Sequence, residues 1–397
     1  MLNCGKERES DDTGLILNTD EAVLAGRVTI VSQALPIALE SGSAGLNSSL
    51  VDFSLTLVAE TTAPQISGDT LQANDVFVDG TYAYVAYNFA GEKGRGGIEV
   101  FDISKNTRPA LKSELLFSDS DINGLAIFDS TMYAVGALPT AATPAFVRTI
   151  GLTSHMLTTD VANFALTSFA GTSVAVDSKT VYAMSGDTGA LALFERGTMT
   201  AKPNLVLKDA RSVRADKKNN AHVLTGQTGV LHIVSTAGVE NATWKVGGAT
   251  IPESKSTLEV GKTTDILALG DGGVKIVCVA DGVVLSSVSA VSKAGIPAAK
   301  SVTNAATARD GLFFTANGEA GVFVYALQKS NSKEASGCDG VGTNLLGSIN
   351  FGSNISANHV FYRSGVLYVA TGLGGLKIIT VDRTKKDGDD KDFDENG

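Results

Sequence analysis

The segment at residues 73–117 contains four short runs in which apolar and polar residues alternate. Gly, Asn and Pro residues separate the runs, which span residues 75–79, 82–87, 97–103 and 111–117. A period of two, bounded by such residues, is the signature of β-strands. The segment therefore predicts a small antiparallel sheet. Because both faces of such a sheet are apolar, it is stable only when similar sheets pack against it.

A glycine that opens the third strand recurs along the chain and marks the phase of a repeat. It is found at Gly97, Gly189, Gly229, Gly273, Gly321 and Gly375. The first interval is about twice as long as the others, so a diverged unit is expected at residues 123–166. Seven units of this kind predict an all-β, seven-bladed β-propeller.

The last repeat has three strands, and residues 50–60 are predicted to supply its fourth strand. This amino-terminal strand would complete the last blade, close the ring and remove exposed sheet edges. The predicted organisation is a flexible tether at 1–20, a cap segment over one end of the propeller at 21–49, the propeller at 50–382 and an acidic disordered tail at 383–397.

Two repeats carry more specific phrases. GGIEVFDIS at residues 96–104 and GGLKIITVD at 374–382 each follow a YVA element, at 84–86 and 368–370. These phrases resemble the bacterial LVIVD-repeat β-propellers. The resemblance implies a propeller at the cell surface or in the periplasm, and it implies no specific chemistry.

The first residues, MLNCGKERESDD, resemble the mature start of a bacterial lipoprotein. In that family the cysteine carries the lipid and the polar stretch behind it is a flexible tether. The resemblance implies a lipid on Cys4, contact with a membrane only through that lipid, and a body anchored at the outer membrane or cell surface. The alternative is an ordinary disordered terminus that contains Cys4.

Composition narrows the possible partners and cofactors. The net charge is −10 and the basic residues are scattered singly, so no nucleic acid partner is expected. No cofactor is expected apart from a possible calcium ion in the tail. There Asp392, Asp394, Asn396 and Gly397 match the first half of a calcium-binding loop, without its bidentate Glu. A monomer is expected.

The three cysteines, Cys4, Cys278 and Cys338, are far apart and form no CxxC motif. Their spacing supports neither a zinc site nor a dense disulfide framework. Cys278 lies in an apolar run and is interpreted as a small buried hydrophobic residue. Cys338 is interpreted as a loop thiol.

Two loops between second and third strands are long, at residues 88–96 and 137–144, and they belong to neighbouring units. Long loops more often carry function than tight ones do, so these two could form one wall of a pocket at the channel mouth. Asn74 and Asn123 are expected on the same face. The ligand-binding candidates are Tyr87, Asn88, Arg95, Arg148, Arg211, Asn304 and His359.

The chemistry of these candidates suits an anionic or sugar ligand. The arginines could bind a carboxylate or sulfate, and Tyr87 could stack on a sugar. The alternative is a ring of polar residues that hydrates the channel mouth. A variable surface insertion is the alternative for the long loops.

No catalytic motif occurs, and the four histidines lie in four different units. The favoured function is therefore a non-enzymatic binding or scaffolding propeller that engages a protein or glycan through its loop face. The alternative is a hydrolase or lyase that uses a channel metal or an Asp/His pair. That alternative predicts that His359 meets two or more carboxylates in the channel.

Overall fold

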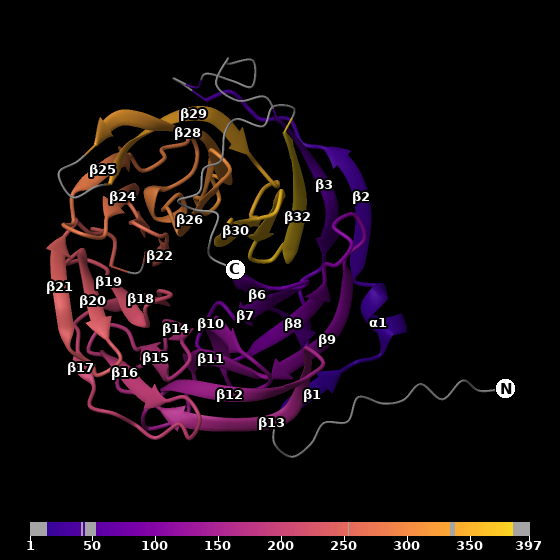
Figure 1. Ribbon diagram of the computed structural model, residues 1–397. Helices are drawn as coiled ribbons and strands as arrows, with labels where there is room; N and C mark the ends of the chain where they lie inside the picture. The colour runs from indigo at the N-terminus through magenta and orange to yellow at the C-terminus, as the bar shows by residue number, and fades with distance from the viewer. Residues whose placement is uncertain (1–13, 41–42, 44–52, 253, 334–337, 384–397) are drawn as a thin grey trace.

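The computed structural model of the protein describes residues 14–40, 43, 53–252, 254–333 and 338–383. These residues form seven antiparallel sheets of four or five strands, which are arranged as blades around a central axis (Figure 1), and one two-stranded hairpin. The predicted all-β, seven-bladed β-propeller is confirmed. None of the helices in these residues is long and apolar enough to cross a membrane.

The blades follow one another along the chain, and each runs from an innermost to an outer strand (Figure 1). Blade 1 has β6 (Gln72–Asp79), β7 (Tyr82–Asn88), β8 (Gly96–Asp102) and β9 (Ala110–Phe117); blade 2 has β10 (Asp121–Phe128), β11 (Thr131–Ala137), β12 (Ala145–Thr153) and β13 (Met156–Ala165). Blade 3 has β14 (Ser173–Val176), β15 (Thr180–Met184), β16 (Ala190–Glu195) and β17 (Leu205–Val206); blade 4 has β18 (Ala210–Ala215), β19 (Asn220–Thr225), β20 (Val230–Ser235) and β21 (Glu240–Lys245).

Blade 5 has β22 (Ser256–Val260), β23 (Thr264–Leu269), β24 (Val274–Cys278) and β25 (Val284–Val288); blade 6 has β26 (Ala305–Arg309), β27 (Leu312–Ala316), β28 (Val322–Lys333) and β29 (Asp339–Ile349). Blade 7 begins with β30 (His359–Arg363), β31 (Val366–Ala370) and β32 (Leu376–Arg383). A short hairpin, β4 (Gln65–Ile66) and β5 (Asp69–Thr70), lies between the closing strand and blade 1, and a 3-10 turn, η1 (Ala298–Lys300), precedes blade 6.

The glycine that marks each repeat has a steric reason. Gly273 and Gly321 open the third strands of blades 5 and 6 with φ of 76° and 93°. A Cβ atom at either position would lie 2.1 Å from a carbonyl oxygen of the fourth strand, that of Val288 or Ile349. Only glycine fits both the positive φ and this close approach.

The amino-terminal strand closes the ring as the sequence predicts. β3 (Phe53–Thr61) pairs antiparallel with β32 and becomes the fourth strand of blade 7, with Leu57 opposite Ile379. Segments from opposite ends of the chain therefore share the last blade, as Figure 1 shows.

The segment before β3 differs from the sequence prediction. β2 (Val28–Ala34) adds a fifth strand to blade 7, and β1 (Leu15–Asn18) adds a fifth strand to blade 1. Helix α1 (Glu21–Ala25) connects them, with Asp20 as its N-cap. The segment therefore runs along the outer edges of two blades and not over one end of the propeller, because the outer strands offer unpaired backbone groups.

β1 also begins inside the residues that the sequence analysis assigned to the tether. Residues 1–13 of that tether, with Cys4, lie outside the described residues. So do the tail beyond residue 383 and the four residues of the calcium-loop match.

Arg27 fixes this segment to the first blade. Its guanidinium forms ion pairs with Glu99 of β8, at 2.5 Å, and with Glu114 of β9. The side chains of Glu99 and Glu114 are 0% and 2% exposed. Arg27 also donates a hydrogen bond of 2.6 Å to the carbonyl oxygen of Thr62, which follows the closing strand.

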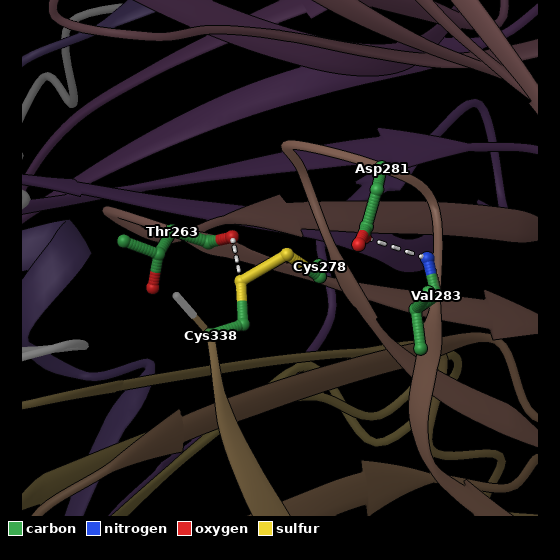
Figure 2. The surroundings of a disulfide bond; sticks show 5 residues. All are labelled: Thr263, Cys278, Asp281, Val283 and Cys338. Atoms are coloured by element: carbon green, nitrogen blue, oxygen red, sulfur yellow. Dashed lines mark hydrogen bonds between the residues drawn. A yellow bond between two sulfur atoms is a disulfide. The ribbon is translucent and has the colours of Figure 1, made fainter. Parts of the chain in front are cut away.

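The interpretation of two cysteines was wrong. Cys278 at the end of β24 and Cys338 just before β29 form a disulfide, with 6.0 Å between their Cα atoms (Figure 2). Cys278 is buried, as expected, but Cys338 is only 2% exposed and is no loop thiol. β28 and β29 form a long hairpin, and its end brings Cys338 of blade 6 to blade 5. Sequence spacing could not show this contact, because 60 positions separate the two cysteines.

Candidate functional site

A cavity of about 290 Å³ lies in the channel among the innermost strands. Its lining comes from the beginnings of β6, β10, β14, β18, β22 and β30, with Asn88 at the end of β7. Strands of six blades therefore contribute to it. Because those strands converge on the propeller axis, side chains far apart in the sequence meet here.

A buried acid and a buried histidine face one another in this cavity. Nε2 of His359 lies 3.4 Å from Oδ1 of Asp75, and the two side chains are each 8% exposed. The other carboxylate oxygen of Asp75 accepts a hydrogen bond of 3.2 Å from the amide of Leu125 in blade 2. The pair therefore lies where blades 7, 1 and 2 meet.

The electrostatic surroundings fix the charges of this pair. Burial, aided by the charges of Lys255 and Arg214, lowers the pKa of His359 to about 3 despite the attraction of Asp75. Burial alone would raise the pKa of Asp75, but His359, Lys255, Arg214 and the Leu125 amide together lower it. At neutral pH the site thus holds a neutral imidazole and a carboxylate.

Two cations complete the cavity. Nζ of Lys255 donates a hydrogen bond of 2.5 Å to the carbonyl oxygen of Asn74, and burial lowers the pKa of Lys255. Nη1 of Arg214 donates to the carbonyl oxygen of Val213, at 3.1 Å, and to Oγ of Ser173, at 3.4 Å. Among the described residues, neither cation has a carboxylate within ion-pair distance. Asp75 is the acid that acts on both through space.

Three polar atoms in the lining lack partners. Oδ1 of Asn74, Nδ1 of His359 and Oγ of Ser256 are buried and have no hydrogen-bond partner within the described residues. Their residues are 8%, 6% and 1% exposed. An unpaired buried polar atom costs about 1–3 kcal/mol, so all three atoms favour a bound group that can pair with them.

The structure places four of the seven sequence candidates at this mouth of the channel. Asn88, Arg211 and His359 line the cavity of 290 Å³, and Asn304 lines a neighbouring cavity of about 330 Å³. Arg211 is paired with Asp209 and with the carbonyl oxygen of Pro252, so its charge is already compensated.

The other three candidates do not belong to the site. Tyr87 is fully buried and its hydroxyl donates to Glu99, so it offers no surface to a sugar. Arg95 pairs with Asp69 of the short hairpin. Arg148 is 3% exposed, and its guanidinium carbon lies 4.4 Å and 4.5 Å from the ring centroids of Phe117 and Phe146.

Tyr87 and Arg148 were wrongly predicted to line the pocket for the same physical reason. Both faces of a blade are buried against neighbouring blades, so alternation along a strand does not reveal which side chains point into the channel. The pocket that the sequence placed between the two long loops is instead centred on the innermost strands.

Asparagines at the channel mouth connect neighbouring blades. Nδ2 of Asn74 donates to the carbonyl oxygen of Ile122, Nδ2 of Asn123 to that of Gly171, and Nδ2 of Asn304 to that of Ala357. Each bond joins one blade to the next and measures 2.9–3.1 Å. These asparagines are therefore structural as well as cavity-lining.

Sequence reasoning did not assign Arg214, Lys255 or Asp75 to the site. A signal for Arg214 was present, because it stands between Val213 and Ala215 in an innermost strand. A charged residue in such a strand is rare unless it faces the channel. For Lys255, which follows an irregular connection, the sequence holds no comparable signal.

The arrangement does not support a channel metal. No group of three or more His, Cys, Asp or Glu side chains that could hold a metal ion occurs in the part of the chain that is described. In that same part, Asp75 is the carboxylate within ion-pair distance of His359. Among the residues with described positions, the two or more carboxylates that the enzymatic alternative predicts around His359 are not found.

His222 lies outside this site and gives a pH prediction. Its Nδ1 lies 2.6 Å from Oδ2 of Asp265 and its Nε2 lies 3.4 Å from Oδ2 of Asp216. Burial opposes the charge, but Asp265 and Asp216 raise the pKa of His222 to about 9. The pKa of a histidine in the unfolded chain is about 6.5. The stabilisation from protonated His222 is therefore complete below that pH and is lost as the pH rises towards 9.

Urea denaturation between pH 6 and pH 10 tests this expectation. The wild type should lose stability across the window, and His222→Gln, which cannot titrate, should lose less. If the free energies of unfolding of the two proteins fall in parallel with pH, His222 is not the group whose titration causes the loss.

Comparison with known proteins supports the fold. No family model and no curated protein matches the sequence. Among solved structures, a chain of the mitotic checkpoint complex is similar with a TM-score of 0.56 and 11% identity, covering 86% of this chain and 98% of that one. The WD40 β-propeller domain of Doa1 has a TM-score of 0.53 and 13% identity, covering 80% and 96%.

A catalytically inactive virginiamycin B lyase from Staphylococcus aureus, solved with quinupristin, has a TM-score of 0.55 and 9% identity, covering 83% of this chain and 99% of that one. At these identities the similarity shows the propeller fold alone. The LVIVD-repeat resemblance stays a prediction from the sequence.

Proposed function

We propose that the protein is a binding propeller that holds an acidic saccharide in the channel cavity. The observation that carries this proposal is the charge of the cavity. Among the residues that line the cavity, Asp75 is the one carboxylate opposite Arg214 and Lys255, and neither cation has an ion-pair partner among the described residues. Glu259, outside the lining, acts on Arg214 through space but not on Lys255. A carboxylate brought by a ligand would balance the excess positive charge and accept charge-assisted hydrogen bonds.

The unpaired atoms support the saccharide class. Asn74 Oδ1 is an acceptor, and Nδ1 of the neutral His359 is also an acceptor when Nε2 carries the proton towards Asp75. Sugar hydroxyls would donate to both. An ammonium group could donate as well, but two cations already in the cavity disfavour it. The volume, near the lower end of the about 300–1,000 Å³ usual for ligand pockets, suits a small unit such as one sugar.

We also propose that the protein acts outside the cytoplasm, as a lipoprotein with its lipid on Cys4. The disulfide between Cys278 and Cys338 supports this location, because such bonds persist in oxidising compartments. The lipoprotein-like start of the sequence supports it independently.

A lyase is the second candidate, and the Asp75–His359 pair in the cavity is the observation that favours it. A histidine with a pKa of about 3 is, however, a weak base at neutral pH. Binding without catalysis is therefore the function that the site supports better.

Titration calorimetry with galacturonate, glucuronate and neutral glucose tests the proposal. The wild type should bind a uronate and not glucose. Lys255→Met and Arg214→Met should each weaken uronate binding about 10- to 100-fold, as expected for a lost hydrogen bond to a charged group. Arg95→Ala, which changes an arginine on the same side but outside the cavity, should leave it unchanged.

Three results would overturn the proposal. They are equal binding of uronate and glucose, binding of a tetraglutamate peptide in place of uronates, and unchanged uronate affinity in both methionine variants. Turnover of a bound uronide that depends on His359 would favour the lyase.

A further inference from the structure

The second cavity, of about 330 Å³, adjoins the first at the channel mouth. Asn74 and Lys255 line both cavities, so the two cavities are direct neighbours. Its remaining lining comes from the connections before β22, β26 and β30 and from the turn between β27 and β28. The two cavities adjoin at Asn74 and Lys255, and together their lining comes from all seven blades.

Apart from Lys255, the charged residues that line the second cavity compensate each other. They are Lys300 and Glu319, which form an ion pair of 2.8 Å. Asn304 and Asn358 add amide groups, each of which already donates to a backbone carbonyl of the neighbouring blade. This lining suits the hydroxyls of a sugar better than a second isolated charge.

Lys255 is placed to serve both cavities. An ammonium group has three N–H donors, and Lys255 uses one of them on the carbonyl oxygen of Asn74. Two donors remain at the junction of the cavities. A ligand that passes from one cavity to the other would meet this charge at its midpoint.

We propose that the site takes an acidic oligosaccharide of at least two residues, with one uronate in the first cavity and the next residue in the second. This inference rests on the proposed function and adds the length of the ligand and a second subsite. The two volumes are similar, at about 290 Å³ and 330 Å³, as expected for two units of one chain. Joining two units makes the second binding event intramolecular, which increases affinity without new contacts in the first cavity.

The test compares galacturonate, digalacturonate and trigalacturonate by titration calorimetry on the full chain. Digalacturonate is expected to bind the wild type at least tenfold more tightly than galacturonate. Lys255→Met should weaken the binding of both ligands, because its charge contacts both cavities.

Ala299→Phe and Ala298→Phe are matched variants in η1. Ala299 lines the second cavity, whereas Ala298 on the same exposed turn lines neither. Ala299→Phe should abolish the gain from galacturonate to digalacturonate and leave galacturonate binding intact. Ala298→Phe should keep the gain.

The outcomes separate the two proposals. Equal affinity of the wild type for galacturonate and digalacturonate would overturn the second subsite and leave the proposed function standing. An undiminished gain in Ala299→Phe would remove the second cavity from the site. Failure of the wild type to bind any of the three ligands would overturn the proposed function itself.

Discussion

Replacing Cys278 and Cys338 by alanine together is expected to lower the free energy of unfolding by about 4 kcal/mol. The disulfide joins residues 60 positions apart, and the loop-closure entropy that it removes from the unfolded chain corresponds to about that value. It also ties blade 5 to blade 6 through the long hairpin of β28 and β29. We expect the loss because no other disulfide joins these blades within the described residues.

Urea denaturation with and without dithiothreitol measures this loss. Reduction should bring the wild type to the stability of the alanine variant, and it should leave that variant unchanged. If the wild type is fully reduced and keeps its stability, that result would contradict the entropic argument. The same samples, assayed for free thiols before reduction, show whether the bond forms in the purified protein.

Replacing Arg27 by methionine is expected to cost about 3–5 kcal/mol, the usual loss when one partner of a buried ion pair is removed. Glu99 and Glu114 would then remain buried without their shared cation. The change also removes the hydrogen bond to Thr62, so the amino-terminal segment would lose its anchor between the closing strand and blade 1.

The pH dependence of this variant provides a sharper measurement. Burial, with Glu114 nearby, raises the pKa of Glu99 to about 7 even though Arg27 opposes the shift. A carboxyl group with a raised folded-state pKa destabilises the folded protein as the pH rises from its unfolded value of about 4.3 through 7. The cost of Arg27→Met should therefore be larger at pH 8 than at pH 5, where Glu99 can take up a proton.

Two further variants control the experiment. Lys112→Met removes an exposed ion pair with Glu21 from the same segment and should cost at most about 1 kcal/mol. Adding Glu99→Gln to Arg27→Met should recover part of the loss, because the unpaired charge is gone. A cost for Arg27→Met no greater than that of Lys112→Met would show that the buried cluster does not hold the segment in place.

Much of the fold was readable from local patterns. Gly273 and Gly321 mark the repeat because each needs a positive φ and no Cβ atom, and this requirement lies within a single blade. The missing strand of the last blade predicted the closing strand, which is found at Phe53–Thr61. The edge strands β1 and β2 were not predicted, because a short strand on an outer edge carries no repeat signal.

The site was readable only in part. Asn88, Arg211 and His359 were predicted at the channel mouth and line the cavity there. Tyr87 and Arg148 were assigned to the same face but pack between blades, where alternation looks the same as at the channel.

The sequence by itself determined the strands of the repeats, the number of blades and the closure of the ring, because each follows from the repeat period and from the strand that the last repeat lacks. Only the tertiary structure decided that Lys255, Arg214 and Asp75 share a cavity and that Cys278 meets Cys338. Those contacts join residues from different blades. Their distances depend on the curvature with which seven sheets pack around one axis, and no local pattern encodes that curvature.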